Sequence, residues 1–212
     1  CGSGALSLAA IDAGAGHVTG VDVSSQMLAV ARARTADLSD KTSFIEADAS
    51  AWQTTTPFDQ LISRFGVMFF ADPVAAFANL HAQMVPGGGL TFACWKALKQ
   101  NNWARAPMAA ALPFLSEPPT APPPGTPGPF AFEDADRTRA LLTDAGWRDV
   151  TITPWTGKLQ LSGDTIEDAA VRLTRFGPLS RVLEEQGVDM APVQAALQTT
   201  LADFLEADGK VR

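Results

Sequence analysis

A glycine-rich loop and two carboxylates are the parts of this sequence best suited to hold a ligand. The loop is Cys-Gly-Ser-Gly at residues 1–4, and it leads directly into a helix-forming stretch. Asp22 stands eighteen residues after Gly4, at the end of a strand-like run over residues 17–21. Glycines let the backbone approach a ligand closely, and a carboxylate at a strand end can accept hydrogen bonds from both hydroxyls of a ribose. This spacing favours a nucleoside-containing ligand over the alternative, a helix-capping turn beside a solvated Asp.

Asp48 is the second carboxylate. It follows a short predicted strand over residues 43–46, so we expect it at the same carboxyl edge of the sheet as Asp22. There it can accept a hydrogen bond from the exocyclic amine of an adenine, while the Ala49 amide donates to a ring nitrogen. The alternative is a turn Asp that caps residues 49–53. We favour the ligand-binding interpretation.

Hydrophobic spacing predicts the elements that position these residues. Strands alternate with helices in the first half, which is typical of a parallel sheet with right-handed crossovers. The predicted helices there are 5–13, 24–35 and 72–84, and the predicted strands are 17–23, 43–46, 58–63 and 90–95.

The second half is expected to be mainly helical. A proline-rich insertion contains one short helix near 103–115, and a capping box at 164–167 opens a later helix. The other predictions are a helix over 133–145, a strand over 147–155 with an extension over 158–161, and helices over 164–176, 179–186 and 191–207.

Five motifs in the expected order resemble class I S-adenosylmethionine-dependent methyltransferases. The resemblance is greatest to the small-molecule branch that includes the ubiquinone/menaquinone-biosynthesis type, and it covers about residues 1–96. The motifs are CGSG at 1–4, VDVSSQML at 21–28, EADA at 46–49, FDQLISRFGVMFF at 58–70 and MVPGGGL at 84–90.

The resemblance implies S-adenosyl-L-methionine as the cofactor and gives each candidate residue a role. Glycines of the loop would lie under the methionine portion, the first carboxylate would hold the ribose, and two apolar residues after it would contact the adenine. The second carboxylate and its neighbour would bind the adenine edge, and the residues ending the fourth strand would line the sulfonium side. In that order, the implied residues are Gly2 and Gly4; Asp22; Val23 and Met27; Asp48 and Ala49; and Ser63, Arg64 and Phe65.

Two departures from the family pattern concern the ends of the chain. The family's first strand carries an acidic residue and a further glycine before the loop, and an antiparallel strand usually ends the sheet. We therefore expect a chain truncated at its N-terminus and also at its C-terminus. The expected fold is α/β, a Rossmann-like doubly wound, mostly parallel sheet that lacks its first strand, with a mainly helical C-terminal insertion or lid. The expected parts are a cofactor-binding core over 1–96, an insertion over 97–132, the remainder of the core over 133–161 and a helical lid over 164–208.

Composition limits the partners. The formal net charge of −7 argues against nucleic acid and against an anionic membrane. No apolar run reaches membrane-spanning length, and two cysteines, Cys1 and Cys94, are too few for a disulfide framework. We expect a cytoplasmic protein with a small-molecule partner, and the sequence leaves its oligomeric state and any lost targeting signal open.

No catalytic base stands out. Methyl transfer from a sulfonium is a direct displacement in which positioning supplies much of the acceleration. His17 and His81 lack Cys or carboxylate neighbours at metal-ligand spacing, so no metal is expected. The expected activity is methyl transfer to a small organic acceptor. Three residues just after the predicted strand over 90–95 either face this acceptor or pack the insertion against the core: Asn101, Trp103 and Arg105.

Two alternative functions remain open. An NAD-dependent dehydrogenase would need a glycine where Ser7 stands, and it would give Asp48 no role. A non-catalytic or inactive truncated nucleoside-cofactor-binding module would account for the absent first strand.

Overall fold

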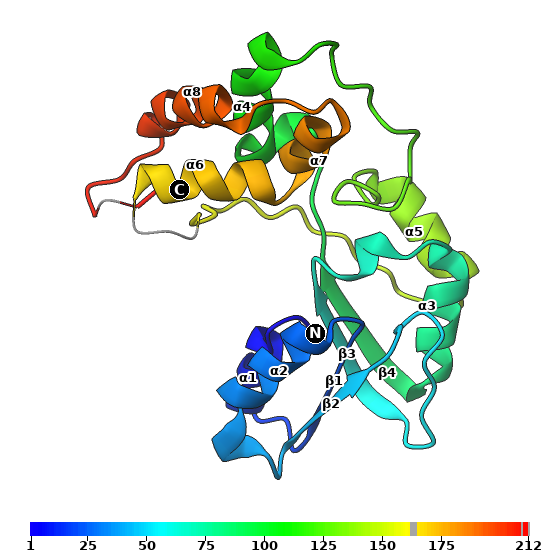
Figure 1. The fold of residues 1–212 in the computed structure, drawn as a ribbon. Helices are drawn as coiled ribbons and strands as arrows, with labels where there is room; N and C mark the ends of the chain where they lie inside the picture. The colour runs from blue at the N-terminus through cyan, green and yellow to red at the C-terminus, as the bar shows by residue number, and fades with distance from the viewer. Residues whose placement is uncertain (162–164, 209, 212) are drawn as a thin grey trace. The chain divides into compact units, whose positions relative to one another are not determined.

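The computed structural model describes residues 1–161, 165–208 and 210–211 (Figure 1). The chain divides into two compact units. One comprises Cys1–Cys94 and Ala131–Ile152 and is called the α/β unit. The other comprises Trp95–Phe130 and Thr153–Arg212 and is called the helical unit.

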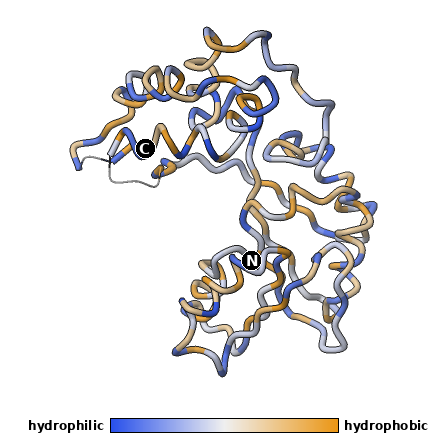
Figure 2. Tube along the Cα trace, in the orientation of Figure 1, coloured by the Kyte–Doolittle hydropathy of each residue, from blue (hydrophilic) through white to orange (hydrophobic). Residues whose placement is uncertain are grey.

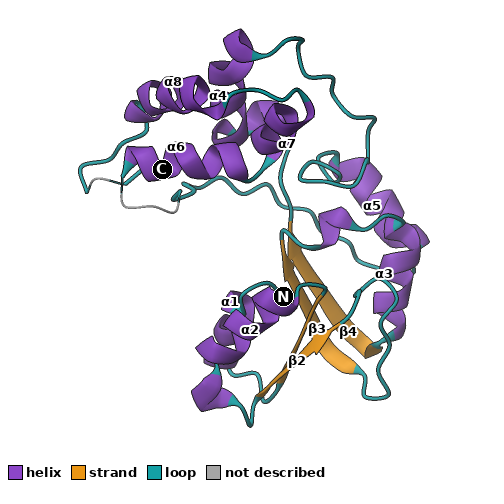
Figure 3. Cartoon of the chain, in the orientation of Figure 1, coloured by secondary structure: helices purple, strands orange, loops and turns teal. Residues whose placement is uncertain are grey.

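The α/β unit contains two pairs of parallel strands (Figure 3). Strand β1 (Val18–Asp22) pairs with β2 (Thr42–Glu46), and its last residue, Asp22, lies opposite Glu46. Strand β3 (Phe58–Arg64) pairs with β4 (Met84–Ala93), and the last pair joins Arg64 to Ala93. The expected α/β class with parallel strands is confirmed, with two separate strand pairs in place of one continuous sheet.

Four helices complete this unit: α1 (Ala5–Asp12), α2 (Ser25–Arg34), α3 (Pro73–Ala82) and α5 (Ala135–Asp144). Helix α1 contacts both β1 and β3, and α3 packs against α5. Side-chain caps fix where two of the helices begin. The Ser24 hydroxyl accepts the Met27 amide at 3.2 Å, and the Asp72 carboxylate accepts the Ala75 amide at 3.0 Å, with a proline at the first helical position of α3.

Phe77 is the centre of the core that α3 and α5 share with the second strand pair. Its side chain is completely buried, and its ring centroid lies 5.5 Å from that of Phe92 on β4 and 5.9 Å from that of Phe132. Burial of aromatic rings in such tilted contacts holds the β3–α3–β4 crossover together.

The helical unit is built from α4 (Asn102–Ala111), α6 (Ile166–Arg175), α7 (Pro178–Glu185) and α8 (Met190–Ala202). Hydrophobic and hydrophilic residues alternate along α6 (Figure 2), which is the pattern of a helix with one buried face. That face joins a core that includes Leu183, Val193 and Leu197. Short 3-10 turns lie at Ala36–Leu38, Val67–Phe69, Leu98–Gln100 and Leu112–Phe114.

The helix predicted over 191–207 ends at Ala202, and three other sequence predictions are also wrong in their boundaries or type. The helix predicted to reach Met84 ends at Ala82, and Met84 is the first residue of β4. The glycines at 87–89 lie within β4, at an irregularity in its pairing with β3, and do not precede the strand. The capping residue of α6 is Thr165, whose hydroxyl accepts the Asp168 amide at 3.1 Å. The box is thus shifted by one residue, and Asp164 lies outside the described residues.

The third error is the strand predicted over 147–155, with its extension over 158–161. The chain there has no strand. Asp149 adopts a left-handed φ of +55°, which interrupts an extended backbone, and Pro154 has no N–H to donate to a ladder. Trp147 is buried for a different reason: its indole N–H donates to the Phe77 carbonyl at 3.0 Å. Near the chain end, the Leu161 amide donates to the Val211 carbonyl at 3.0 Å.

Candidate functional site

The glycine loop before α1 is shaped by two left-handed residues. Gly2 has φ +58° and Gly4 has φ +79°, a conformation that side chains other than glycine rarely adopt. Gly4 is also buried against α2: a Cβ added there would lie 3.0 Å from the Ala31 Cβ. The loop therefore requires glycine at Gly4 both for its backbone and for close packing.

Asp22 connects this loop to the end of β1. Its Oδ2 accepts the Gly2 amide at 2.6 Å and the Cys1 nitrogen at 2.8 Å, and its Oδ1 accepts the Ser24 amide at 3.0 Å. Burial alone would raise the pKa of Asp22, but these hydrogen bonds, together with the positive charge of the Cys1 amino group, outweigh it and lower the pKa below its ordinary value. Asp22 is therefore an ionised acceptor that contacts the glycine loop directly.

Two backbone amides donate to Asp22, one to each carboxylate oxygen: the Gly2 amide to Oδ2 and the Ser24 amide to Oδ1. A carboxylate offers about four acceptor positions, so these two amides leave a second position on each oxygen. That Asp22 accepts both hydroxyls of a ribose stays a prediction.

Two apolar side chains next to Asp22 are exposed. Val23 is 69% exposed and Met27 is 48% exposed, although both are hydrophobic. Burying such surface under a ligand is favourable, at about 25 cal/mol per Å². Their position and exposure suit the adenine contact that the family resemblance implies for them.

Asp48 lies in a turn just beyond β2. The Ala47 amide donates to the Asp22 carbonyl at 3.1 Å, so the turn starts at the same strand edge where Asp22 lies. Asp48 Oδ1 accepts the Ser50 amide at 2.8 Å. Hydrogen bonds from the Ser50 side chain and backbone outweigh burial and lower the pKa of Asp48. The turn Asp of the alternative interpretation is thus present, and the Ser50 backbone and side chain both donate to its carboxylate.

A cavity of about 320 Å³ opens beside Asp48. This volume lies at the lower end of the range for ligand pockets and suits one part of a ligand such as a base. Its walls are the turn after β2, the connection from β3 to α3 and the first turn of α3, namely Asp48, Ser50, Phe69, Phe70, Ala71, Asp72, Ala75 and Ala76. Among the sequence-predicted site residues, Asp48 lines this cavity, while Asp22 is not part of its wall.

Phe69 is a candidate site residue in an aromatic run, residues 65–70, whose sequence predicts mostly core with part of a pocket wall and does not single Phe69 out. It lines the cavity and is 56% exposed, which is unusual for a phenylalanine that the chain could bury. The run Phe65–Gly–Val–Met–Phe–Phe resembles core in sequence, and Val67 and Met68 are indeed buried. All three residues lie in the 3-10 turn Val67–Phe69, where successive side chains point in different directions. Sequence spacing does not show this turn.

The residues ending β3 lie at the edge of the second strand pair. Ser63 and Arg64 are its last two residues, and the Phe65 amide donates to the Ala93 carbonyl at 3.0 Å. Phe65 has φ +60°, which for a non-glycine residue costs about 1–3 kcal/mol. Such strain commonly accompanies functional sites, and it turns the chain sharply after the strand.

The structure thus joins the predicted residues into groups. The glycine loop, Asp22 and the exposed pair Val23 and Met27 surround the end of β1. Asp48 and Ala49 follow β2 at the same strand edge, and Ser63, Arg64 and Phe65 end the second pair of strands.

Other polar candidates have structural partners. His17 Nε2 lies 3.0 Å from the Ser43 hydroxyl, and the exposed His81 ring packs edge-on against Trp147 with centroids 5.0 Å apart. Asn101 donates to the carbonyls of Lys96 and Ala97 at 2.7 and 3.0 Å.

Trp103 and Arg105 also make contacts within the helical unit. The Trp103 ring packs against Trp95 with centroids 4.7 Å apart, and Arg105 donates to the Asn102 side chain at 2.9 Å. These contacts, like those of Asn101, lie within the helical unit and do not decide between facing an acceptor and packing against the core. Within the residues that the structure describes, no group of three or more His, Cys, Asp or Glu could hold a metal ion.

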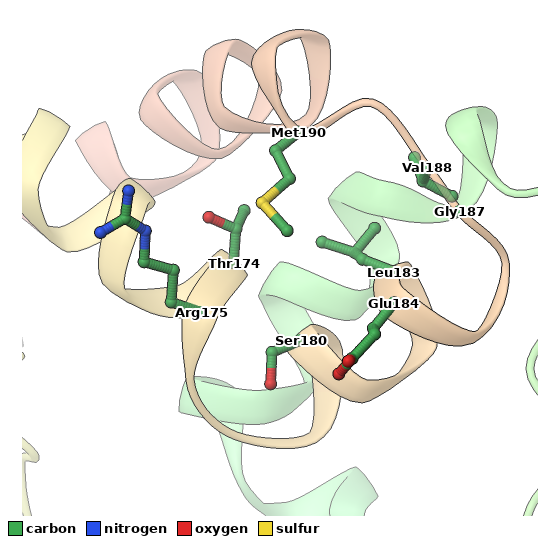
Figure 4. Close-up of a pocket in the computed structure, with 8 residues that line it drawn as sticks. All are labelled: Thr174, Arg175, Ser180, Leu183, Glu184, Gly187, Val188 and Met190. Carbon is green, nitrogen blue, oxygen red and sulfur yellow. The ribbon is translucent and has the colours of Figure 1, made fainter.

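A larger hollow of about 530 Å³ lies wholly within the helical unit (Figure 4). It is formed by the end of α6, by α7 and by the start of α8, and it contains none of the sequence-predicted site residues. Its lining residues are Thr174, Arg175, Ser180, Leu183, Glu184, Gly187, Val188 and Met190.

Comparison with known proteins bears on the α/β unit. Residues 1–88 match the family model of a methyltransferase domain. Every sequence-predicted cofactor-binding residue, from Gly2 to Phe65, lies within this match. The matched region has the Rossmann-like α/β architecture of that family, with its strand pairs parallel, in agreement with the fold class expected from the motifs.

Solved structures give partial matches. An S-adenosylmethionine-dependent methyltransferase from Mesorhizobium loti is 31% identical over 43% of this chain and 42% of its own, with a TM-score of 0.40. The glycopeptide N-methyltransferase MtfA, crystallised with S-adenosyl-L-methionine, is 25% identical over 45% of each chain, with a TM-score of 0.41. The N-methyltransferase NodS from Bradyrhizobium japonicum is 18% identical over 68% of this chain and 67% of its own, with a TM-score of 0.45.

The chain spans less than half the length of the first structures that it matches. A comparison with curated proteins finds no match. In the part of the chain that the structure describes, no helix has the length and apolarity needed to cross a bilayer.

Proposed function

We propose that this chain binds S-adenosyl-L-methionine and transfers its methyl group to a small organic acceptor by direct displacement. The observation that carries the proposal is the methyltransferase-domain match over residues 1–88, which contains the whole candidate site. We place the chain in the small-molecule branch that includes the ubiquinone/menaquinone-biosynthesis type, on its motif order, and in the cytoplasm.

The residues at the strand ends fit this cofactor. In this proposal Asp22 accepts a hydrogen bond from the ribose, and Asp48 accepts one from the adenine amine. Val23, Met27 and Phe69 offer exposed apolar surface for the flat faces of the base. Both carboxylates are ionised at neutral pH because their pKa values are lowered.

When bound, the cofactor supplies an activated methyl group on a sulfonium. The chain's own contribution is to hold and orient it. The loop at Gly2 and Gly4 brings backbone close to the ligand, and Ser63, Arg64 and Phe65 would line its reactive side. No proton transfer by the protein is assigned, since positioning supplies much of the acceleration in such a displacement.

Isothermal titration calorimetry with S-adenosyl-L-methionine and its demethylated product tests the proposal. We expect saturable binding, and Asp22→Ala should weaken it by about 10-fold to 100-fold, the range of a lost hydrogen bond to a charged group. Asp12→Ala is the matched control, because Asp12 is an exposed carboxylate at the end of α1.

Two outcomes would contradict the proposal. A folded wild-type chain that binds neither ligand would favour the non-catalytic module. Saturable binding of NAD, with none of S-adenosyl-L-methionine, would favour the dehydrogenase alternative.

A further inference from the structure

The polar face of α3 holds the turn that carries Asp48. The Asn79 side-chain amide donates to the Trp52 carbonyl at 2.9 Å and to the Ala49 carbonyl at 3.4 Å. One helical turn later, Gln83 Oε1 accepts the Thr54 amide at 2.8 Å. The segment from Asp48 to Thr54, called here the 48–54 turn, is thus attached to α3 along most of its length.

The attachment at Ala49 bears directly on the Asp48 carboxylate. The Ala49 carbonyl and the Ser50 N–H belong to one planar peptide group. Asn79 holds the carbonyl end of this group, and the N–H end donates to Asp48 Oδ1 at 2.8 Å. The orientation of the carboxylate is therefore linked to Asn79 through a single rigid plane.

The same helix also contributes to the cavity beside Asp48. The capping residue Asp72 and, within α3, Ala75 and Ala76 line it together with Asp48 and Ser50. One helix thus lines the cavity and, through Asn79, also holds the turn that carries Asp48. Gln83 supports this arrangement, since its side chain is buried and its amide donates to the Asn79 carbonyl at 3.2 Å.

We infer that Asn79 is a positioning residue that sets the Asp48 carboxylate for recognition of the 6-amino group of the cofactor's adenine. This inference rests on the proposed function. Asn79 acts through the peptide group of Ala49 and Ser50 and needs no contact with the cofactor. A residue that only stabilises the fold would weaken all ligands alike, whereas Asn79 should affect the preference for the amino group.

The test compares two ligands, S-adenosyl-L-homocysteine and its analogue with hydrogen in place of the 6-amino group. The ratio of their Kd values, measured by calorimetry, reports the contribution of the amino group. We expect the wild-type chain to prefer the amino ligand by about 10-fold or more, and Asp48→Asn to abolish most of this preference. Asn79→Ala should reduce the ratio in the same direction.

Gln186→Ala is the matched control. Gln186 also fixes a loop through its side-chain amide, accepting the Ser116 amide at 2.9 Å and donating to the Glu117 carbonyl at 3.0 Å, but it belongs to the helical unit. Its substitution should leave the ratio of Kd values unchanged. Circular dichroism on each variant checks folding, and Asn79→Asp, which keeps the side-chain shape but loses the amide donors, replaces Asn79→Ala if the latter does not fold.

The outcomes separate this inference from the proposed function. If the wild-type chain binds neither ligand, the proposed function fails, and hydrogen exchange of the 48–54 amides still reports whether Asn79 holds the turn. We expect exchange at Ser50 to be about tenfold faster in Asn79→Ala, from the loss of a hydrogen bond. The inference is overturned if the wild-type ratio persists in the variant, if exchange is unchanged, or if both substitutions prevent folding.

Discussion

At Gly4, the backbone and the packing impose separate requirements. Its φ of +79° disfavours any side chain, and the Ala31 Cβ would lie 3.0 Å from an added Cβ. Gly14 offers the comparison, because it has φ +98° with nothing within 4 Å of an added Cβ. The two positions therefore separate conformational strain from steric overlap.

We predict that Gly14→Ala lowers the free energy of unfolding by about 1–2 kcal/mol, the cost of a left-handed alanine. Gly4→Ala should cost about 1–3 kcal/mol more, since Ala31 is fully buried and the overlap must be relieved by moving α2. Urea unfolding at 25 °C measures both values. Equal losses for the two variants would show that the loop is not tightly packed on α2.

Residue types and spacing were enough to predict the glycine loop, Asp22 and Asp48. They place a carboxylate at a strand end, and the structure has both carboxylates beside the first strand pair. Spacing does not reveal that three N–H donors already occupy Asp22, because two of them come from the loop twenty or more residues earlier. The role of Asn79 was equally hidden, since its partners lie 27 and 30 residues away in the sequence.

Among the elements, the segment after α5 shows where local pattern fails. Residues 147–155 are rich in β-branched and aromatic types, yet the segment is irregular. Trp147 is 7% exposed and is held by its bond to the Phe77 carbonyl, whereas Trp155 is 79% exposed. Burial at one end of the segment thus comes from α3, a tertiary contact that periodicity cannot predict.

These two tryptophans provide a paired test at this scale. Trp147→Ala should lower the free energy of unfolding by about 3–5 kcal/mol, because it removes a large buried ring between α3 and α5. Trp155→Ala should change it by less than about 0.5 kcal/mol, as for other exposed positions. Chemical denaturation followed by far-UV circular dichroism compares them, and a large effect at Trp155 would support the strand that the structure lacks.

The helices were easier to predict because their signals are local. Ser24 caps α2 and Asp72 caps α3, and both residue types are common at helix starts, while Pro73 takes the first helical position of α3. For α6 the capping residue is Thr165, one position beyond the prediction, since several capping residues adjoin each other there. Strand pairing is not local, and so the division into two strand pairs was not foreseen.

For the molecule as a whole, the two units have separate cores. Leu28 on α2 and Leu197 on α8 are both completely buried, the first in the α/β unit and the second in the cluster around α6, α7 and α8. We predict that Leu28→Ala and Leu197→Ala each cost about 2–5 kcal/mol, the range for a cavity left by leucine.

Differential scanning calorimetry should show that the two substitutions shift different transitions, because each removes contacts from one core only. The cofactor provides a second readout. Added S-adenosyl-L-methionine should raise the temperature of the transition that Leu28→Ala lowers, since a ligand stabilises the unit that binds it. A single transition moved equally by both variants would mean that the chain unfolds as one cooperative body.

The order of the units along the chain has a consequence for protein synthesis. Ala131–Ile152 belongs with Cys1–Cys94, and the stretch Trp95–Phe130 between them belongs elsewhere. A ribosome adds about 5–20 residues per second, and nascent domains fold as they emerge. The core around Phe77 therefore lacks Phe132 and Trp147 until the ribosome has translated residues 95–130, which belong to the helical unit. During that interval its aromatic surface is uncovered, and transiently exposed apolar surface of this kind promotes aggregation.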